Sequence, residues 1–85
     1  MYCVNWKKKA RKQLDKIDNK QTRNEIYDAV ATLGNFPDVG QVKQLTNHQY
    51  DYRLRVGRYR VFFDVADAVR IISIEEVKKR DDRTY

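Results

Sequence analysis

The sequence has little cysteine, histidine, glycine or proline: its 85 residues include one Cys, one His, three Gly and one Pro. A single cysteine, Cys3, excludes an intramolecular disulfide, and a small fold without disulfides fits a reducing compartment. In an early strand, Cys3 is expected to act as a small hydrophobic residue. A single histidine, His48, excludes a catalytic pair of histidines, and a lone histidine in a polar stretch is typical of a solvated residue. No set of His, Cys, Asp and Glu has the spacing of metal ligands, so neither a metal nor another cofactor is expected.

Long apolar segments are also missing. No hydrophobic run approaches the about 20 residues that a membrane-spanning helix needs. Lys7, Lys8 and Lys9 interrupt the N-terminal stretch too early for a signal-peptide core. The sequence therefore predicts a soluble, cytoplasmic protein made of one small domain, residues 1–85. A domain of this size needs most of its apolar residues for the core, which favours a function carried on the surface.

Positive charge, in contrast, is in excess. The chain has 18 Lys and Arg against 12 Asp and Glu, and its formal net charge is +6. On a small domain this surplus favours a polyanionic partner, either a nucleic acid or an acidic protein. A solvated lysine surface would give the same total, so the charge alone does not identify the partner.

The hydrophobic periodicity of the first half predicts a strand followed by two helices. Residues 2–6 alternate and indicate a strand, and the stripe of Ala10, Leu14 and Ile17 indicates a helix that starts at Lys7. Asp18-Asn19 is typical of a break and a new N-cap. A second helix then extends to a stop at Gly34 and Asn35.

The second half predicts strands. The polar stretch from Gln41 to Gln49 fits either a loop or a short edge strand around residues 42–45, and residues 69–77 are rich in Ile and Val and indicate the last strand. The order is therefore β-α-α-β-β-β. We expect an α+β fold in which both helices pack on one face of a mainly antiparallel four-stranded sheet.

The clearest pattern is a β-hairpin around Gly57-Arg58. Two alternating runs, residues 52–56 and 59–65, flank this Gly-X dipeptide, which is typical of a two-residue turn. Such a turn pairs Arg55 with Arg60 and Leu54 with Val61. The residues expected to face the helices are Leu54, Val56, Tyr59, Val61 and Phe63. Arg53, Arg55 and Arg60 are expected on the opposite face.

Arginines directly opposite each other destabilise a strand pair, by up to about 1 kcal/mol. A sequence selected only for stability would place Glu, Thr or Gln at one of these positions, so the cluster favours a function. The structural alternative is that Asp51, Asp64 or Glu76 neutralises the arginines, or that water and salt screen them.

The segment YDYRLRVGRYRVFFDV, followed by an Ile-rich strand and a basic tail that ends in Tyr, resembles the RelE/ParE superfamily of bacterial toxins. The resemblance covers essentially the whole chain and includes the β-α-α-β-β-β order. It implies a toxin of a type II toxin–antitoxin system. In the RelE branch it further implies cleavage of mRNA in the ribosomal A site, inhibition of translation and control by a cognate antitoxin. The ParE branch shares the fold but poisons DNA gyrase.

Residue by residue, the resemblance favours the RelE branch. It implies two basic residues around an apolar one, here Arg53 and Arg55, and a further arginine early in the next strand, here Arg60. It also implies a basic residue beyond the last strand, followed by a tyrosine. The basic residue is Arg80 or Lys79, and the tyrosine is Tyr85. The implied catalytic set is Arg53, Arg55, Arg60, Arg80 and Tyr85.

The chemistry of RNA cleavage is compatible with this set. RNA carries its own nucleophile, the 2′-OH, so an enzyme supplies a base, positive charge on the phosphorane and an acid for the leaving oxygen. Guanidinium groups bind phosphate in bidentate fashion and stabilise a nearby phenolate. The hypothesis is that Tyr85 acts as the base or as a stacking residue, that the three strand arginines bind the phosphate, and that Arg80 serves the leaving oxygen, without a metal.

Other basic residues are candidates for contacts with RNA or the ribosome, because phosphate contacts position a protein without reading sequence. They are Lys7, Lys8, Lys9, Lys12, Lys43, Arg58, Lys79 and Arg83. A charged helix face is equally typical of a solvated surface. The expected partners are a cognate antitoxin, the ribosome and mRNA. Two further functions stay open: inhibition of gyrase, and non-catalytic binding of RNA or of an acidic antitoxin.

Overall fold

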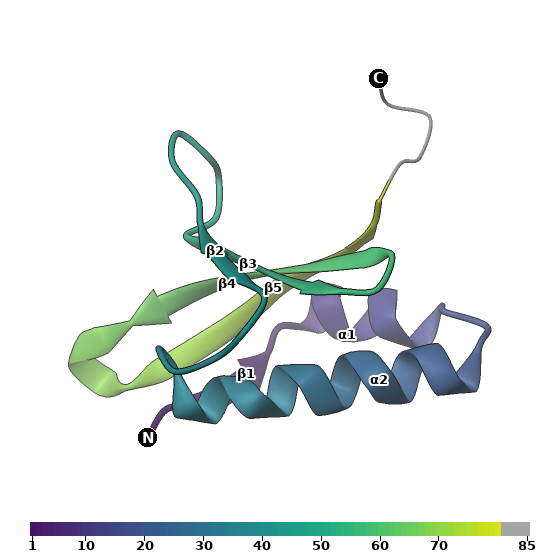
Figure 1. The fold of residues 1–85 in the computed structure, drawn as a ribbon, viewed down its shortest axis with the longest axis horizontal. Coiled ribbons are helices and arrows are strands. Elements are labelled where there is room, and N and C mark those ends of the chain that lie inside the picture. The colour runs from purple at the N-terminus through teal and green to yellow at the C-terminus, as the bar shows by residue number, and fades with distance from the viewer. Residues whose placement is uncertain (81–85) are drawn as a thin grey trace.

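The computed structural model describes residues 1–80, which form two helices and a five-stranded sheet. Both helices, α1 (Lys8–Asp15) and α2 (Lys20–Ala31), lie on one side of the sheet (Figure 1). The strands are β1 (Cys3–Trp6), β2 (Val42–Gln44), β3 (Tyr52–Val56), β4 (Tyr59–Ala66) and β5 (Ile71–Lys79). No helix within residues 1–80 is long and apolar enough to cross a membrane.

The spatial order of the strands is β1-β5-β4-β3-β2. The edge strand β1 pairs with β5 in parallel, and the other neighbours pair antiparallel. The predicted α+β class, the order of the elements and the packing of both helices on one face are confirmed. The predicted number of four strands is one too low, because residues 42–44 pair with β3 as the edge strand that the sequence left open.

The helices begin and end where local chemistry allows. The side chain of Asn19 accepts a hydrogen bond from the Thr22 backbone N–H at 3.1 Å, so the predicted N-cap of α2 is confirmed. After Ala31 the chain tightens into a 3₁₀ turn, Thr32–Asn35, which buries Leu33. The two helices cover the sheet with their apolar sides, and Ala10, Leu14, Ile26 and Val30 are buried there.

The core lies between the helices and the inner face of β3, β4 and β5. Its largest fully buried side chains are Phe63, Ile26, Leu33, Ile72, Ile74, Val30 and Val61. A β-bulge interrupts the pairing of β4 with β5: Phe62 lies opposite Glu76, whereas Phe63 lies opposite Ile74. The extra residue keeps both Ile74 and Val77 in the core, although they are three positions apart.

Two expectations need correction. Cys3 lies in β1 as predicted, but its side chain is exposed and does not contribute to the core. The last strand starts at Ile71 rather than residue 69, because a 3₁₀ turn, Asp67–Val69, follows β4. Arg70 ends this turn with a left-handed backbone, φ 57°, which reverses the chain into β5.

Gly57 is the residue whose backbone fixes the hairpin, and its replacement by alanine should destabilise the fold by about 1–2 kcal/mol. Its φ of +56° is strained for any residue with a Cβ, although nothing lies within 4 Å of the position that a Cβ would take. Gly40→Ala is the matched control, because that site is equally open and has no positive φ. Urea unfolding followed by circular dichroism should show a lower midpoint for Gly57→Ala only. Equal midpoints for the two variants would contradict the requirement for a positive φ at Gly57.

Candidate nucleic-acid interface

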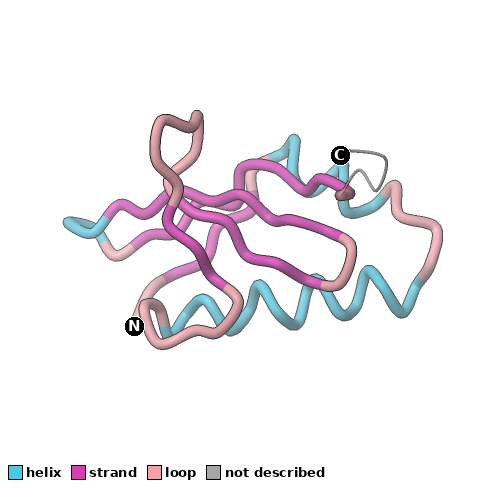
Figure 2. The backbone as a smooth tube through the Cα atoms, turned by 45° about the horizontal axis from the view of Figure 1, so that its top comes forward, coloured by secondary structure: helices cyan, strands magenta, loops and turns pink. Residues whose placement is uncertain are grey.

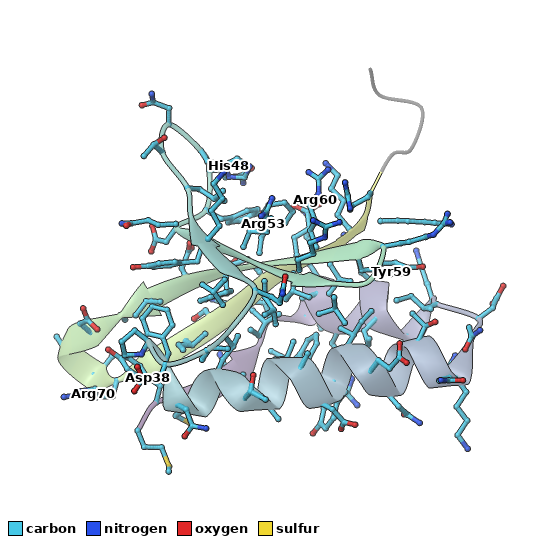
Figure 3. All side chains as sticks on the ribbon, viewed as in Figure 1. Asp38, His48, Arg53, Tyr59, Arg60 and Arg70 are labelled. Atoms are coloured by element: carbon cyan, nitrogen blue, oxygen red, sulfur yellow. The ribbon has the colours of Figure 1, made fainter. Side chains whose placement is uncertain are left out.

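The hairpin register places three arginines on the face of the sheet that points away from the helices. Arg55 pairs with Arg60 and Leu54 pairs with Val61, so the predicted register is confirmed. Leu54 and Val61 are buried, at 2% and 0% exposure, and lie in the core. Alternation then puts Arg53, Arg55 and Arg60 outside. Figure 3 shows Arg53 and Arg60 on this outer side, above the strands that cover the helices.

Two lysines from the flanking strands extend this cluster. Lys43 of β2 lies opposite Arg53, and Lys78 of β5 lies opposite Arg60. One row across the sheet is therefore Arg55, Arg60 and Lys78, with three positive charges side by side. We call Lys43, Arg53, Arg55, Arg60 and Lys78 the arginine face. The sequence alone does not place Lys78 beside Arg60, because alternation does not reveal the β-bulge that sets their register.

The acidic residues near the arginine face contact groups other than its arginines, although Glu76 lies opposite Phe62 on the same side of the sheet. Glu76 pairs with Lys9 of α1 at 3.7 Å. Asp64 accepts a hydrogen bond from the Asp51 backbone N–H at 2.8 Å, and Asp51 accepts one from the Val65 N–H at 3.3 Å. Within residues 1–80, no carboxylate forms an ion pair with the three arginines. Direct contacts with the described carboxylates therefore do not neutralise the three arginines.

Arg53 has a further unusual feature. Its Nε atom is buried and has no hydrogen-bond partner within the described residues. A buried donor without a partner costs about 1–3 kcal/mol, and more when it belongs to a charged group. Because this atom is buried, an anion would reach Arg53 through the terminal nitrogens of its guanidinium group, which can bind phosphate in bidentate fashion.

An aromatic cluster lies beside Arg53 on the same face. Phe62 is the position of β4 directly opposite Arg53, yet it is only 6% exposed. The loop between β2 and β3 covers it: the ring of Tyr50 lies 5.6 Å from that of Phe62, and the ring of His48 stacks on it at 5.2 Å and 14°. This loop projects on the side away from the helices (Figures 1 and 2). We call His48, Tyr50 and Phe62 the aromatic cluster.

A hydrogen bond within the loop holds the aromatic cluster in place. Nδ1 of His48 accepts a hydrogen bond from the Tyr50 backbone N–H at 3.1 Å. Burial, followed by the negative charge of nearby Glu76, raises the pKa of Tyr50 above its ordinary value and so favours the protonated phenol. The sequence pattern indicates a solvated His48 and no particular role for Tyr50, whereas both rings pack on Phe62. The sequence feature that indicates a covered outer surface is Phe62, a large apolar residue at a position of β4 that faces the same side as the arginines.

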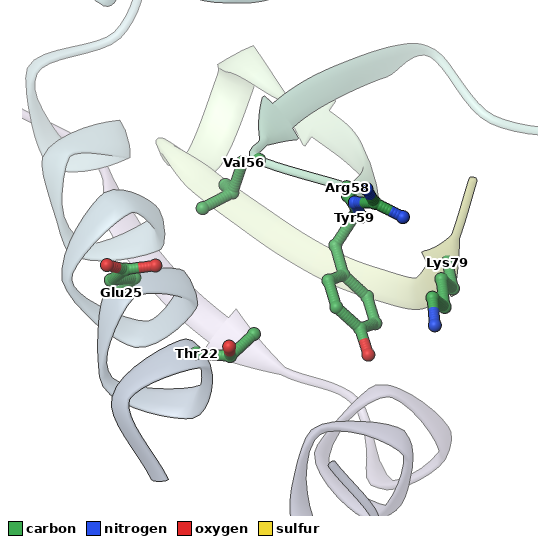
Figure 4. Close-up of a pocket in the computed structure, with 7 residues that line it drawn as sticks. Thr22, Glu25, Val56, Arg58, Tyr59 and Lys79 are labelled. Carbon is green, nitrogen blue, oxygen red and sulfur yellow. The ribbon is translucent and has the colours of Figure 1, made fainter. Parts of the chain in front are cut away.

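The residues proposed near the end of the last strand separate onto two sides. Lys79 lies opposite Tyr59, on the helix side of the sheet. With Arg58 it lines a cavity of about 240 Å³ between the hairpin turn and α2, which also includes Thr22 and Glu25 (Figure 4). Arg80 follows Lys78 by two positions, and its N–H donates to the Arg58 carbonyl at 2.7 Å. Of the two alternatives, Arg80 is thus the one in phase with the arginine face. Arg83 and Tyr85 lie outside the described residues.

The lysines of the first helix form a separate basic surface. Lys8, Lys9 and Lys12 line a shallow depression on α1 together with Gln13 and Lys16. Lys7 precedes the helix, and its N–H donates to the Ile74 carbonyl at 3.0 Å. None of these residues belongs to the arginine face, so the structure presents two basic surfaces, one on the sheet and one on α1.

Comparison with known proteins identifies the group to which this arrangement belongs. Residues 4–83 match the family described as the ParE toxin of the type II toxin–antitoxin system. Among proteins with curated functions, none matches the sequence closely enough to count as a relative.

Solved structures with the same fold include the isolated RelE toxin of E. coli, with a TM-score of 0.78, 17% identity, and coverage of 95% of this chain and 86% of that chain. The archaeal RelE–RelB complex of Pyrococcus horikoshii matches with a TM-score of 0.77 and 27% identity, covering 98% of both chains. A YoeB/ParE toxin of Agrobacterium tumefaciens matches with a TM-score of 0.73 and 11% identity, covering 95% of this chain and 100% of that chain. The hairpin, the one-sided helices and the match over residues 4–83 agree: the chain belongs to the RelE/ParE superfamily of type II toxin–antitoxin toxins.

Proposed function

We propose that this toxin is a ribosome-dependent, metal-independent endoribonuclease that cleaves mRNA in the A site and so inhibits translation. The observation that carries the proposal is the arginine face, because it gathers positive charge on neighbouring strands without ion pairs to the described carboxylates. A sheet that tolerates this repulsion in the free state offers the charges to an anionic ligand.

The proposed reaction uses the RNA's own 2′-OH as nucleophile. The 2′-oxygen forms a bond to phosphorus, the bond from phosphorus to the 5′-oxygen breaks, and the products are a 2′,3′-cyclic phosphate and a free 5′-OH. Arg53, Arg55 and Arg60 bind the phosphate and the charge that develops on it. Arg80 stabilises or protonates the leaving oxygen, and Tyr85 takes the 2′ proton or stacks on a base.

The ribosome and an antitoxin are the proposed partners. Guanidinium and phenol groups are weak acids and bases at pH 7, so cleavage depends on an external surface that aligns the RNA for in-line attack. The lysines of α1 and Arg83 are candidates for contacts with ribosomal RNA. Complexes of RelE with RelB are among the structural neighbours, which supports a cognate antitoxin for this toxin as well. Action on the ribosome requires that the toxin be cytoplasmic.

Inhibition of DNA gyrase is the second candidate, because the matching family is described as ParE. A gyrase inhibitor would bind a protein surface and would leave RNA intact. Non-catalytic binding of RNA or of the antitoxin by the arginine face is a further alternative.

One experiment separates these functions. The toxin is added to a translating extract that contains enough EDTA to bind transition metals but leaves the Mg²⁺ that ribosomes need, and the 5′ ends of a reporter mRNA are mapped. Cuts within A-site codons, with cyclic or 3′-phosphate ends, are expected for the wild type and for Lys20→Ala, which removes a unit of charge from α2. They should be lost in Arg60→Ala and reduced in Tyr85→Phe. Intact mRNA together with linearised plasmid in a gyrase assay would assign the toxin to the second candidate.

A further inference from the structure

From the geometry we infer that the aromatic cluster, His48, Tyr50 and Phe62, is a stacking subsite for an RNA base next to the phosphate-binding arginine face. The inference rests on the proposed function in that both use the same RNA, but it concerns a different contact. The arginine face binds phosphate, whereas the aromatic cluster binds the flat surface of a nucleobase.

The three rings of the aromatic cluster contact one another, and the imidazole of His48 belongs to an exposed residue. Tyr50 is buried, at 9% exposure, and already covers the outer side of Phe62. His48 adds a second, nearly parallel ring over Phe62, and the residue itself is exposed. One surface of the imidazole therefore faces Phe62 and the other faces solvent.

The hydrogen bond within the loop fixes the orientation of the ring and the tautomer of its neutral form. Because Nδ1 accepts from the Tyr50 N–H, a neutral His48 carries its proton on Nε2. The ring thus presents an open π surface and a donor at its edge. Nucleobases stack on such surfaces regardless of sequence, and their edges carry the acceptors that a donor can contact.

The neighbouring charge favours RNA over other occupants of the ring. Phe62 and Arg53 are directly paired across β3 and β4, so the stack and the arginine with the unpartnered Nε are adjacent. Figure 3 shows His48 and Arg53 next to each other on the outer side of the sheet, with Arg60 farther along the same side. An aromatic ring beside guanidinium groups is the combination that binds single-stranded nucleic acid, with stacking on the base and charge on the backbone.

The test measures RNA binding, not cleavage. Short single-stranded RNAs with 2′-O-methyl groups cannot be cut, and one carries 2-aminopurine, whose fluorescence is quenched when it stacks. A second RNA has the same phosphates but abasic sites. Affinity is measured by anisotropy for the wild type, His48→Ala, His48→Phe and the control Gln49→Ala, which alters an exposed neighbour in the same loop. Thermal unfolding checks that each variant is folded.

We expect His48→Ala to weaken binding of the base-bearing RNA by about tenfold and to abolish the quenching, because a base on an aromatic ring contributes about 1–3 kcal/mol. Binding of the abasic RNA should not change. His48→Phe retains the stacking surface and should restore affinity and quenching, and Gln49→Ala should behave as the wild type.

Three results would overturn the inference. The first is an unchanged affinity of His48→Ala for the base-bearing RNA, and the second is an equal loss of affinity for both RNAs. The third is a loss of affinity for the antitoxin with no loss of affinity for either RNA. The last result would assign the rings to the antitoxin interface. Quenching by a toxin that does not cut mRNA would refute the proposed nuclease while supporting the stacking subsite, so the two failures are distinguishable.

Discussion

Replacement of Arg60 by threonine should slow mRNA cleavage by about 100-fold or more and at the same time stabilise the folded toxin. The loss of rate is expected because Arg60 lies at the centre of the arginine face, between Arg55 and Lys78. Removal of one donor from a site that stabilises developing negative charge typically costs about 100- to 1000-fold in rate. The gain in stability is expected because the same change removes two like-charge neighbours, and threonine suits a strand.

Two measurements check this expectation. Single-turnover cleavage on programmed ribosomes gives the rate, and urea unfolding gives the stability. The stability gain should be up to about 1 kcal/mol at low salt and should shrink near 1 M salt, where charges are screened within about 3 Å. Lys20→Thr, on α2, should change neither quantity appreciably. An Arg60→Thr variant that is less stable at low salt would show that Arg60 is part of the fold's own interactions, and one that cuts at the wild-type rate would remove it from the catalytic set.

The hairpin could be predicted from the sequence because a two-residue turn fixes pairing by counting alone. Once Gly57 and Arg58 form the turn, Arg55 must oppose Arg60, and the observed register agrees. The helices were equally accessible, since each shows its apolar stripe within a single segment and α2 starts at a recognisable cap, Asn19. The family resemblance was accessible for the same reason, because its most specific segment is this hairpin.

Features that depend on distant segments were not predictable in the same way. The pairing of Val42–Gln44 with β3 places Lys43 opposite Arg53. A strand of three residues within a polar stretch is too short to show an alternating pattern in the sequence. The parallel pairing of β1 with β5 joins the two ends of the fold. The β-bulge had a signal, namely the spacing of three between the core residues Ile74 and Val77, and it determines that Lys78 joins the arginine face. The aromatic cluster requires a loop to fold back over Phe62, which alternation within β4 cannot reveal.

Replacement of Phe63 by alanine should strongly destabilise the toxin, whereas the same change at the preceding residue should cost much less. The ring of Phe63 is fully buried and packs against two other aromatic rings, Tyr52 at 5.5 Å and Phe36 at 6.1 Å. Removal of such a ring costs about 3–5 kcal/mol. A domain of this length has a total stability of about 4–13 kcal/mol, from about 0.05–0.15 kcal/mol per residue, so the loss is a large share of the total.

Phe62→Ala is the matched control, because it removes the same atoms from the adjacent residue on the opposite face of β4. Phe62 is covered on the solvent side by a loop, from which Tyr50 and His48 can settle into the vacated space, so we expect less than half of the loss at Phe63. Urea unfolding of the isolated toxin, without antitoxin to shift the equilibrium, gives both values. Phe62→Ala should instead lose the fluorescence quenching of a stacked base, since His48 then has no ring beneath it. Equal destabilisation by the two substitutions would mean that the outer aromatic cluster is a second core of the fold and not a surface kept for a ligand.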